Sequence, residues 1–165
     1  MSEGQLAGGT RSWRAWLGLA TLIAGTCDIC FATGYSYVRA GVAPARVLKF
    51  VASGALGASA LSGGAGTAAL GLGFHYLNAF LITAIFFAAA SWRPSLVRRS
   101  LPIGVLYGVV VYLVMNFVVI PLSRIGPRSG RATVTVVSEL LVHMFLIGVP
   151  IAWAARKAFA DSSQG

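Results

Sequence analysis

Seven side chains that could bind a ligand or carry a proton interrupt long apolar segments of this 165-residue chain. They are Asp28, His75, Asn78, Tyr112, Asn116, Glu139 and His143. Two histidines with two carboxylates form a ligand set that suits zinc, iron or manganese. Glu139 and His143 stand four residues apart, so both can face one ion from the same side of a helix. The metal interpretation therefore names His75, His143, Asp28 and Glu139 as ligands.

The same residues allow other chemistry. Two histidines on separate helices can hold a haem or a related macrocycle axially. Chains of Asp, Glu and His side chains also pass protons in transporters. Asn78, Tyr112 and Asn116 are equally typical of hydrogen bonds that join packed helices. The residue types leave a metal, a haem, a proton or another ligand open.

The segments that carry these residues are long enough to cross a membrane. The chain is 57% hydrophobic and only 10% charged, against about 25% charged residues in a soluble domain. Four apolar segments cover residues 13–38, 67–90, 101–122 and 133–155. A span takes roughly 20 residues, and its backbone must bond internally as a helix. We expect an all-α integral membrane protein: one domain over residues 1–165, with four transmembrane helices in an antiparallel bundle.

A fifth segment, residues 44–56, is too polar to span and too apolar for a solvated loop. Pro44 suits the first turn of a helix. Arg46, Lys49 and Ser53 then recur at helical spacing among apolar residues. This pattern predicts an amphipathic helix that lies in the headgroup plane between the first and second spans.

The basic residues indicate a lipid partner. The net charge is +9, and its arginines and lysines flank the apolar segments. Anionic lipid headgroups are therefore the expected partners, together with the bilayer itself, and nucleic acid is not expected. The charges divide almost evenly between the two ends of the spans, so they do not determine the orientation in the membrane. A homo-oligomer and a subunit of a larger membrane complex both stay open.

The polar residues are expected to meet in one pocket. At 100° per residue, each span carries a single polar stripe beside small residues, and Gly104 and Gly108 predict a close helix contact. The spans alternate in direction, yet the charged residues fall in the same half of the membrane, about 9–15 Å below one surface. We expect Asp28, His75 and His143 to approach one another there. Asp28 should pair with a histidine directly or through a water or an ion, because a lone carboxylate in hydrocarbon is costly.

Cys27 and Cys30 form a CxxC pair inside the first span. Four spans with CxxC resemble the quinone-linked membrane enzymes that form disulfides, but those require a second cysteine pair, which this sequence lacks. Packing is the expected role of both thiols.

Two stretches carry a family resemblance. ASGALGASALSGGAGTAALGLGFH (residues 52–75) and YGVVVYLVMNFVVIPLS (residues 107–123) resemble the YagU-like small bacterial inner-membrane proteins. The similarity extends over residues 17–155. It implies a multi-pass protein of the bacterial inner membrane, and it assigns no activity to particular residues.

The expected function is that of a small membrane protein whose buried Asp/His/Glu pocket binds a ligand, a metal or a proton, for transport or sensing. One alternative is a cofactor-binding (haem-type) or accessory subunit of a larger membrane complex. A membrane enzyme is the second alternative, and the sequence has no Ser-His-Asp pattern, HExxH motif or phosphate-binding loop to favour it.

Overall fold

The computed structural model of the chain describes residues 12–128 and 130–160, and every regular element within them is helical. The elements are α1 (Trp13–Ala40), α2 (Pro44–Leu56), η1 (Ala58–Ser62), α3 (Ala65–Trp92), α4 (Ser95–Arg98), α5 (Ser100–Val114), η2 (Met115–Val119), α6 (Ile120–Leu122), α7 (Thr133–Val142), η3 (His143–Gly148) and α8 (Val149–Ala160). Element η1 is a 3₁₀-helix, whereas η2 and η3 are π-helical segments inside longer helices.

Four of the helical rods are long and apolar enough to cross a membrane. They are α1, α3, the rod Ser100–Leu122 built from α5, η2 and α6, and the rod Thr133–Phe159 built from α7, η3 and α8. The predicted all-α fold with four spanning helices is confirmed. Several of these helices extend beyond the apolar segments predicted from the sequence. For example, α1 continues to Ala40 and ends where Gly41 adopts a left-handed conformation, φ 64°, that glycine tolerates best.

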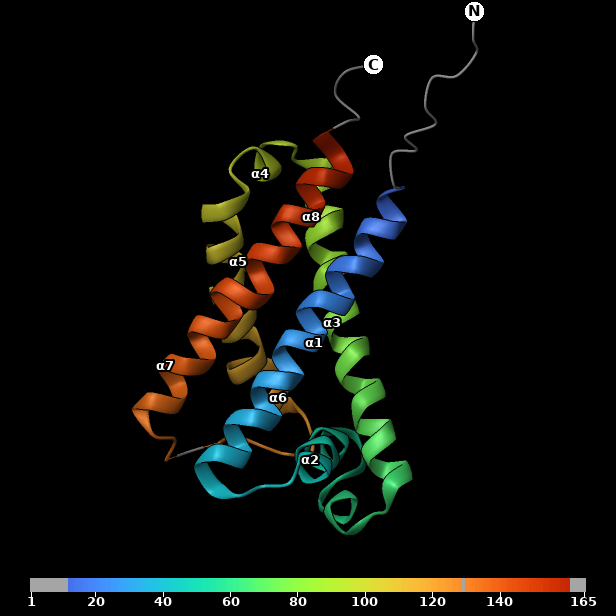
Figure 1. Cartoon of the computed structure of the whole chain (residues 1–165), viewed down its shortest axis with the longest axis vertical. Helices are drawn as coiled ribbons and strands as arrows, with labels where there is room; N and C mark the ends of the chain where they lie inside the picture. The colour runs from blue at the N-terminus through green and yellow to red at the C-terminus, as the bar shows by residue number, and fades with distance from the viewer. Residues whose placement is uncertain (1–11, 129, 161–165) are drawn as a thin grey trace, which may run out of the picture.

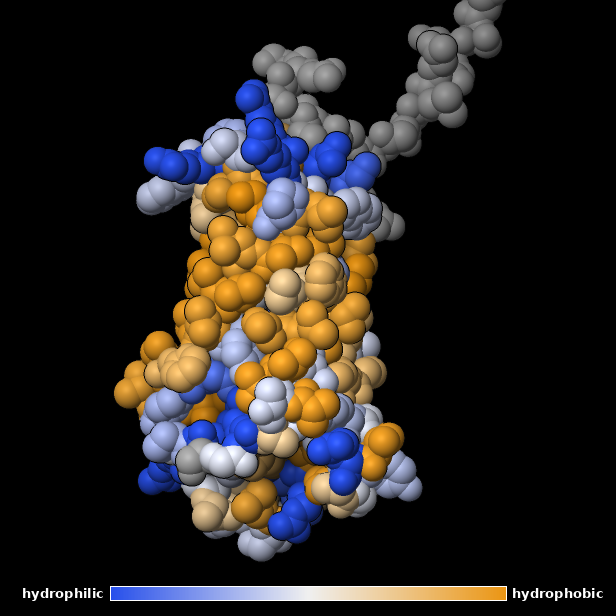
Figure 2. Space-filling model, turned by 90° about the vertical axis from the view of Figure 1, so that its left-hand side faces the viewer, coloured by the Kyte–Doolittle hydropathy of each residue, from blue (hydrophilic) through white to orange (hydrophobic). Residues whose placement is uncertain are grey.

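Figure 1 shows the rods as a bundle with the start of α1, the end of α8 and the short α4 at one end, here called the upper end. The opposite, lower end holds α2, η1 and the connection before α7, described over residues 123–128 and 130–132. Figure 2 shows an apolar band across the middle of the face in view, with hydrophilic residues gathered at both ends. This is the surface expected of helices whose sides face lipid.

The upper half contains the packed core. Small residues such as Ala20 and Ala24 of α1 meet Phe86 and Phe87 of α3 and Ile151 of α8. The upper ends of α1 and α8 are also joined by the edge-to-face rings of Trp16 and Trp153, whose centroids are 5.6 Å apart. The core residues of this cluster come from the upper and middle parts of the rods, so the tightest packing lies away from the lower end.

Glycines bring α5 against the fourth rod. A Cβ atom at Gly104 would lie 2.7 Å from Val149 Cα, and one at Gly108 would lie 2.5 Å from Met144 Cα. Neither separation leaves room for a methyl group, so the two backbones can be this close only because both positions are glycine. The predicted close helix contact at Gly104 and Gly108 is confirmed, and it places η3 beside the middle of the bundle.

The helix predicted at residues 44–56 forms as α2. It crosses the lower end of the bundle (Figure 1) and packs on α3 at Gly71, where a Cβ atom would collide with the Leu48 carbonyl. The backbone N–H of Arg124 donates to Gly54 O at 2.9 Å, which ties α2 to the connection before α7 as well. The position of α2 in the headgroup plane stays a prediction.

Candidate functional site

A cavity of about 660 Å³ occupies the middle and lower part of the bundle. Its walls come from α1, α3, η2, α7 and η3, and α2 contributes residues from below. Six of the seven predicted site residues line it: Asp28, His75, Asn78, Asn116, Glu139 and His143. The seventh, Tyr112, does not line the cavity. It is buried, with its ring edge-to-face on the His143 ring at 5.4 Å between centroids.

His75 is positioned by a close contact between α1 and α3. A Cβ atom at Gly25 would lie 2.9 Å from the Tyr76 ring, so the missing side chain lets α3 approach α1 at this level. His75 Nε2 then lies 2.8 Å from Gly25 O. Because a carbonyl oxygen only accepts, Nε2 carries the proton of this bond. The neutral ring keeps Nδ1 as an acceptor.

His143 is positioned within the fourth rod. Its Nδ1 lies 2.8 Å from Glu139 O, one turn earlier, so Nδ1 carries a proton and Nε2 is the acceptor of the neutral ring. The residue also begins the π-helical segment η3. On the facing rod, η2 begins at Met115, whose Sδ accepts a bond from Asn78 Nδ2 at 3.3 Å. Single π-helical turns of this kind are frequent at functional sites, because they redirect side chains inside a helix.

Asp28 is the polar residue whose partners differ most from expectation. It is half-buried on α1 and lines the cavity. It lies within electrostatic range of His143, His75 and Glu139. Yet no group in the described part of the chain donates a hydrogen bond to its carboxylate, since both histidines bond to backbone carbonyls instead. The expected direct pair between Asp28 and a histidine is therefore not formed.

Glu139 has a cationic partner that the sequence analysis did not name. Its carboxylate forms an ion pair with Arg131, from the connection before α7. Arg131 and Arg128 also donate to Asn116 Oδ1, each at 2.7 Å. Burial lowers the pKa of the Arg131 guanidinium, but the hydrogen bond and charge of Glu139 outweigh burial and raise the pKa above its usual value. Burial and the charge of Arg131 lower the pKa of Arg128.

The four proposed metal ligands do not converge. Within residues 12–128 and 130–160, no three His, Cys, Asp or Glu side chains lie close enough together to hold a metal ion. Glu139 turns to Arg131, and each histidine has one ring nitrogen bonded to a carbonyl. The described geometry does not support a site built from His75, His143, Asp28 and Glu139, and metal binding by these residues stays a prediction. Haem binding by the two histidines stays a prediction.

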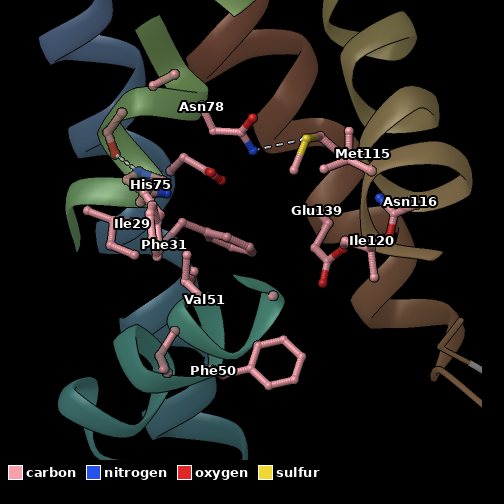
Figure 3. A pocket seen from close by; sticks show the side chains of 18 of the residues that line it. Ile29, Phe31, Phe50, Val51, His75, Asn78, Met115, Asn116, Ile120 and Glu139 are labelled. Carbon is pink, nitrogen blue, oxygen red and sulfur yellow. Dashed lines mark hydrogen bonds between the residues drawn. The ribbon is translucent and has the colours of Figure 1, made fainter. Parts of the chain in front are cut away.

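The side chains around the cavity face a common space. Figure 3 shows His75 and Asn78 on α3 opposite Glu139 on the fourth rod, with Phe50 and Val51 of α2 below them. On the other side, the Tyr35 hydroxyl is 2.9 Å from Thr135 Oγ1, which joins the lower part of α1 to α7. Most of the remaining wall is aliphatic or aromatic. The cavity is an apolar space with a few polar groups aimed into it.

The molecule is hollowed near its lower end. In Figure 2 hydrophilic residues surround this hollow, and apolar residues form part of its floor. Figure 1 shows the lower end of α7 splayed outward from the neighbouring rod. Arg46 of α2 and Arg128 line the cavity and are exposed, so they belong to its rim. Cationic groups thus mark the mouth, whereas Asp28 lies deeper.

The sequence analysis did not name three arginines as site residues. Arg46 and Arg128 line the cavity, and Arg131 pairs with the cavity residue Glu139. The sequence analysis placed Arg46 near lipid headgroups and counted the other two only in the balance of charge between the two ends. A short connection with three arginines, the last of them eight residues before a glutamate in a predicted span, could have suggested the Arg131–Glu139 pair. Cys27 and Cys30 are free thiols, and neither lines the cavity.

No family model matches this chain, and no curated protein and no solved structure matches it either. The resemblance to the YagU-like proteins therefore stays a prediction.

Proposed function

We propose that this membrane protein uses its cavity to bind a small molecule with an apolar body and a polar group, for transport or sensing. The observation that carries the proposal is the lining of the cavity: a mostly apolar wall into which Asp28, His75, His143 and Asn78 project. Ligand sites typically enclose about 300–1,000 Å³ and combine an apolar lining with a few placed polar groups. The cavity of about 660 Å³ falls in that range.

The position of the cavity supports a ligand that partitions into membranes. The hollow lies beside the apolar band, and the lower end of α7 splays away from its neighbour (Figures 1 and 2). A molecule dissolved in the lower leaflet can reach such a hollow without crossing the packed upper half. We further propose that α2 lies in the headgroup plane, with its basic residues near anionic lipids, and that the protein resides in a bacterial inner membrane.

Ionisable groups inside spans are costly, and they usually mark ligand or proton pathways. Helix packing alone gives a weaker account of Asp28, because glue residues bond to a neighbouring helix and Asp28 receives no hydrogen bond from the residues that the structure describes. Four spans leave little space for two alternating openings, so a transporter built from this chain would work as an oligomer.

The test is to identify the small molecules that stay bound to the protein during purification. Protein purified in mild detergent is extracted with organic solvent, and the extract is analysed by mass spectrometry. Ala32→Phe places a ring in the cavity wall, whereas Ala88→Phe places the same ring on an exposed position of α3 outside the cavity. We expect wild type and Ala88→Phe to retain the same small molecule and Ala32→Phe to lose it. Identical extracts from all three folded proteins would contradict the proposal.

A further inference from the structure

We propose, on the basis of the ligand-binding cavity above, that its deep end binds a primary ammonium group carried on an apolar body, in exchange for a proton on Asp28. Three acceptor groups stand at this end: the Asp28 carboxylate and, on His75 and His143, the ring nitrogen that does not bond to a backbone carbonyl. A primary ammonium has three N–H donors and no acceptor, as in a lysine side chain. The donors of the ligand and the acceptors of the cavity match in number.

Charge selects the same ligand. Twelve residues separate Asp28 from the lower end of α1 at Ala40, which is about 18 Å along the helix. A bare carboxylate at this depth is costly, so either a proton or a cation must neutralise it. The other carboxylate of the cavity, Glu139, already pairs with Arg131. Asp28 is therefore the anionic group left for a ligand among the described cavity residues.

The charged and titratable groups around Asp28 are accounted for on each neighbouring element. The spanning helices contribute Tyr35 from α1, His75 from α3, Glu139 from α7 and His143 from η3. The lower end contributes Arg46 from α2, and Arg128 and Arg131 from the connection before α7. The arginines lie at the mouth or on Glu139 and not at the deep end. An aminolipid keeps its ammonium at the bilayer surface, whereas Asp28 lies about 18 Å along α1 from the lower end of that helix, so we take the ligand to be a free amine.

The exchange step balances in atoms and charge. Protonated Asp28 meets the ammonium ion of the ligand, the carboxyl O–H bond breaks, and the proton leaves to water. The carboxylate and the ammonium then form an ion pair, with no covalent bond to the ligand. One proton is released for each amine bound, so amine affinity rises with pH through the range in which Asp28 gives up its proton.

The probes are three molecules with one body: 4-phenylbutylamine, 4-phenylbutanol and 4-phenylbutanoate. Their binding to the full chain in detergent is measured by calorimetry, with proton release followed by a pH dye in weak buffer. Wild type should bind the amine best and release one proton per amine. Asp28→Asn, an isosteric change, should weaken the amine by about thirty-fold or more and abolish proton release. Glu139→Gln should weaken it less, because Glu139 is paired with Arg131.

The outcomes separate this inference from the proposed function. Equal binding of alcohol and amine, with no effect of Asp28→Asn, overturns the ammonium inference and leaves the cavity a ligand site. Preferential binding of 4-phenylbutanoate that survives in Asp28→Asn overturns it in favour of the arginines at the mouth. The proposed function itself is contradicted if wild type binds none of the three probes and its solvent extract contains the same small molecules as the extract of Ala32→Phe.

Discussion

Gly108→Ala tests the helix contact that places His143 beside the cavity. The added Cβ atom would lie 2.5 Å from Met144 Cα and closer still to His143 O, and both partners are backbone atoms that no rotamer change can move. Raising the first distance to the 3.4 Å at which ordinary contact begins requires a shift of about 0.9 Å, and the closer contact with His143 O requires more. A gap of that size forfeits roughly a quarter to a half of each contact energy along the seam.

We expect this overpacking to cost about 1–3 kcal/mol of unfolding free energy. Gly73→Ala is the matched control, because it lies on an exposed part of a spanning helix with nothing within 4 Å of the added atom. An alanine there should stabilise the helix by up to about 1 kcal/mol. The two identical substitutions should therefore have opposite signs.

The assay is unfolding of the detergent-solubilised protein by increasing fractions of sodium dodecyl sulfate. Tryptophan fluorescence is a suitable signal, since Trp16 and Trp153 pack together only in the folded bundle. Gly108→Ala should also weaken ligand retention, because it displaces η3 and His143. If Gly108→Ala proves as stable as Gly73→Ala, the rods are not in backbone contact at this level, and the account of how His143 is placed is wrong.

Two further predictions concern the lower end. In the same assay, Arg131→Gln should lower the unfolding free energy about 1–2 kcal/mol more than Glu139→Gln does, after allowance for partial exposure of the pair. Arg131→Gln leaves the Glu139 carboxylate without its cation, whereas in Glu139→Gln the Arg131 side chain keeps its bond to Asn116. Equal effects of the two substitutions would refute the pairing. A spin label at Lys49 of α2 should report a depth at the headgroup level in lipid bilayers, and full solvation or burial at the bilayer centre would contradict the interfacial position of that helix.

The sequence predicted the spans and six of the polar residues of the cavity wall because both depend on simple physical limits. A helix needs roughly 20 apolar residues to cross the hydrocarbon, and the four apolar segments meet that requirement. Intramembrane polar groups turn inward because lipid offers them no partner. Asp28, His75 and His143 were therefore expected to face the bundle, and the position of each residue along its span predicted their similar depth.

Other features of the site depend on tertiary geometry, which the helical periodicity of the sequence does not predict. Tyr112 and Asn116 share a face at 3.6 residues per turn, but the π-helical turn that begins at Met115 changes that register. Tyr112 packs on His143, and Asn116 reaches the cavity. The Arg131–Glu139 pair depends on the path of an irregular connection, and no period in the sequence reports such a path.

The backbone carbonyls that accept hydrogen bonds from His75 and His143 could not be predicted from the sequence for a similar reason. Every residue has a carbonyl, so the sequence does not show which one a histidine will reach. For His75 the choice depends on Gly25, whose missing side chain brings α3 close to α1. This choice leaves Asp28 available to a ligand.

The proposed binding at Asp28, with release of a proton to water, requires that the cavity open to water at the lower end of the bundle. In a background without Cys27 and Cys30, Ala79→Cys places a thiol on the cavity wall near the middle of α3, and Ala88→Cys places one on the same helix outside the cavity. The measurement is the rate of modification by a membrane-impermeant methanethiosulfonate in oriented proteoliposomes. We expect rapid modification of Ala79→Cys when the reagent faces the end that carries α2, and none from the opposite side. Modification no faster than that of Ala88→Cys from either side would contradict the claim.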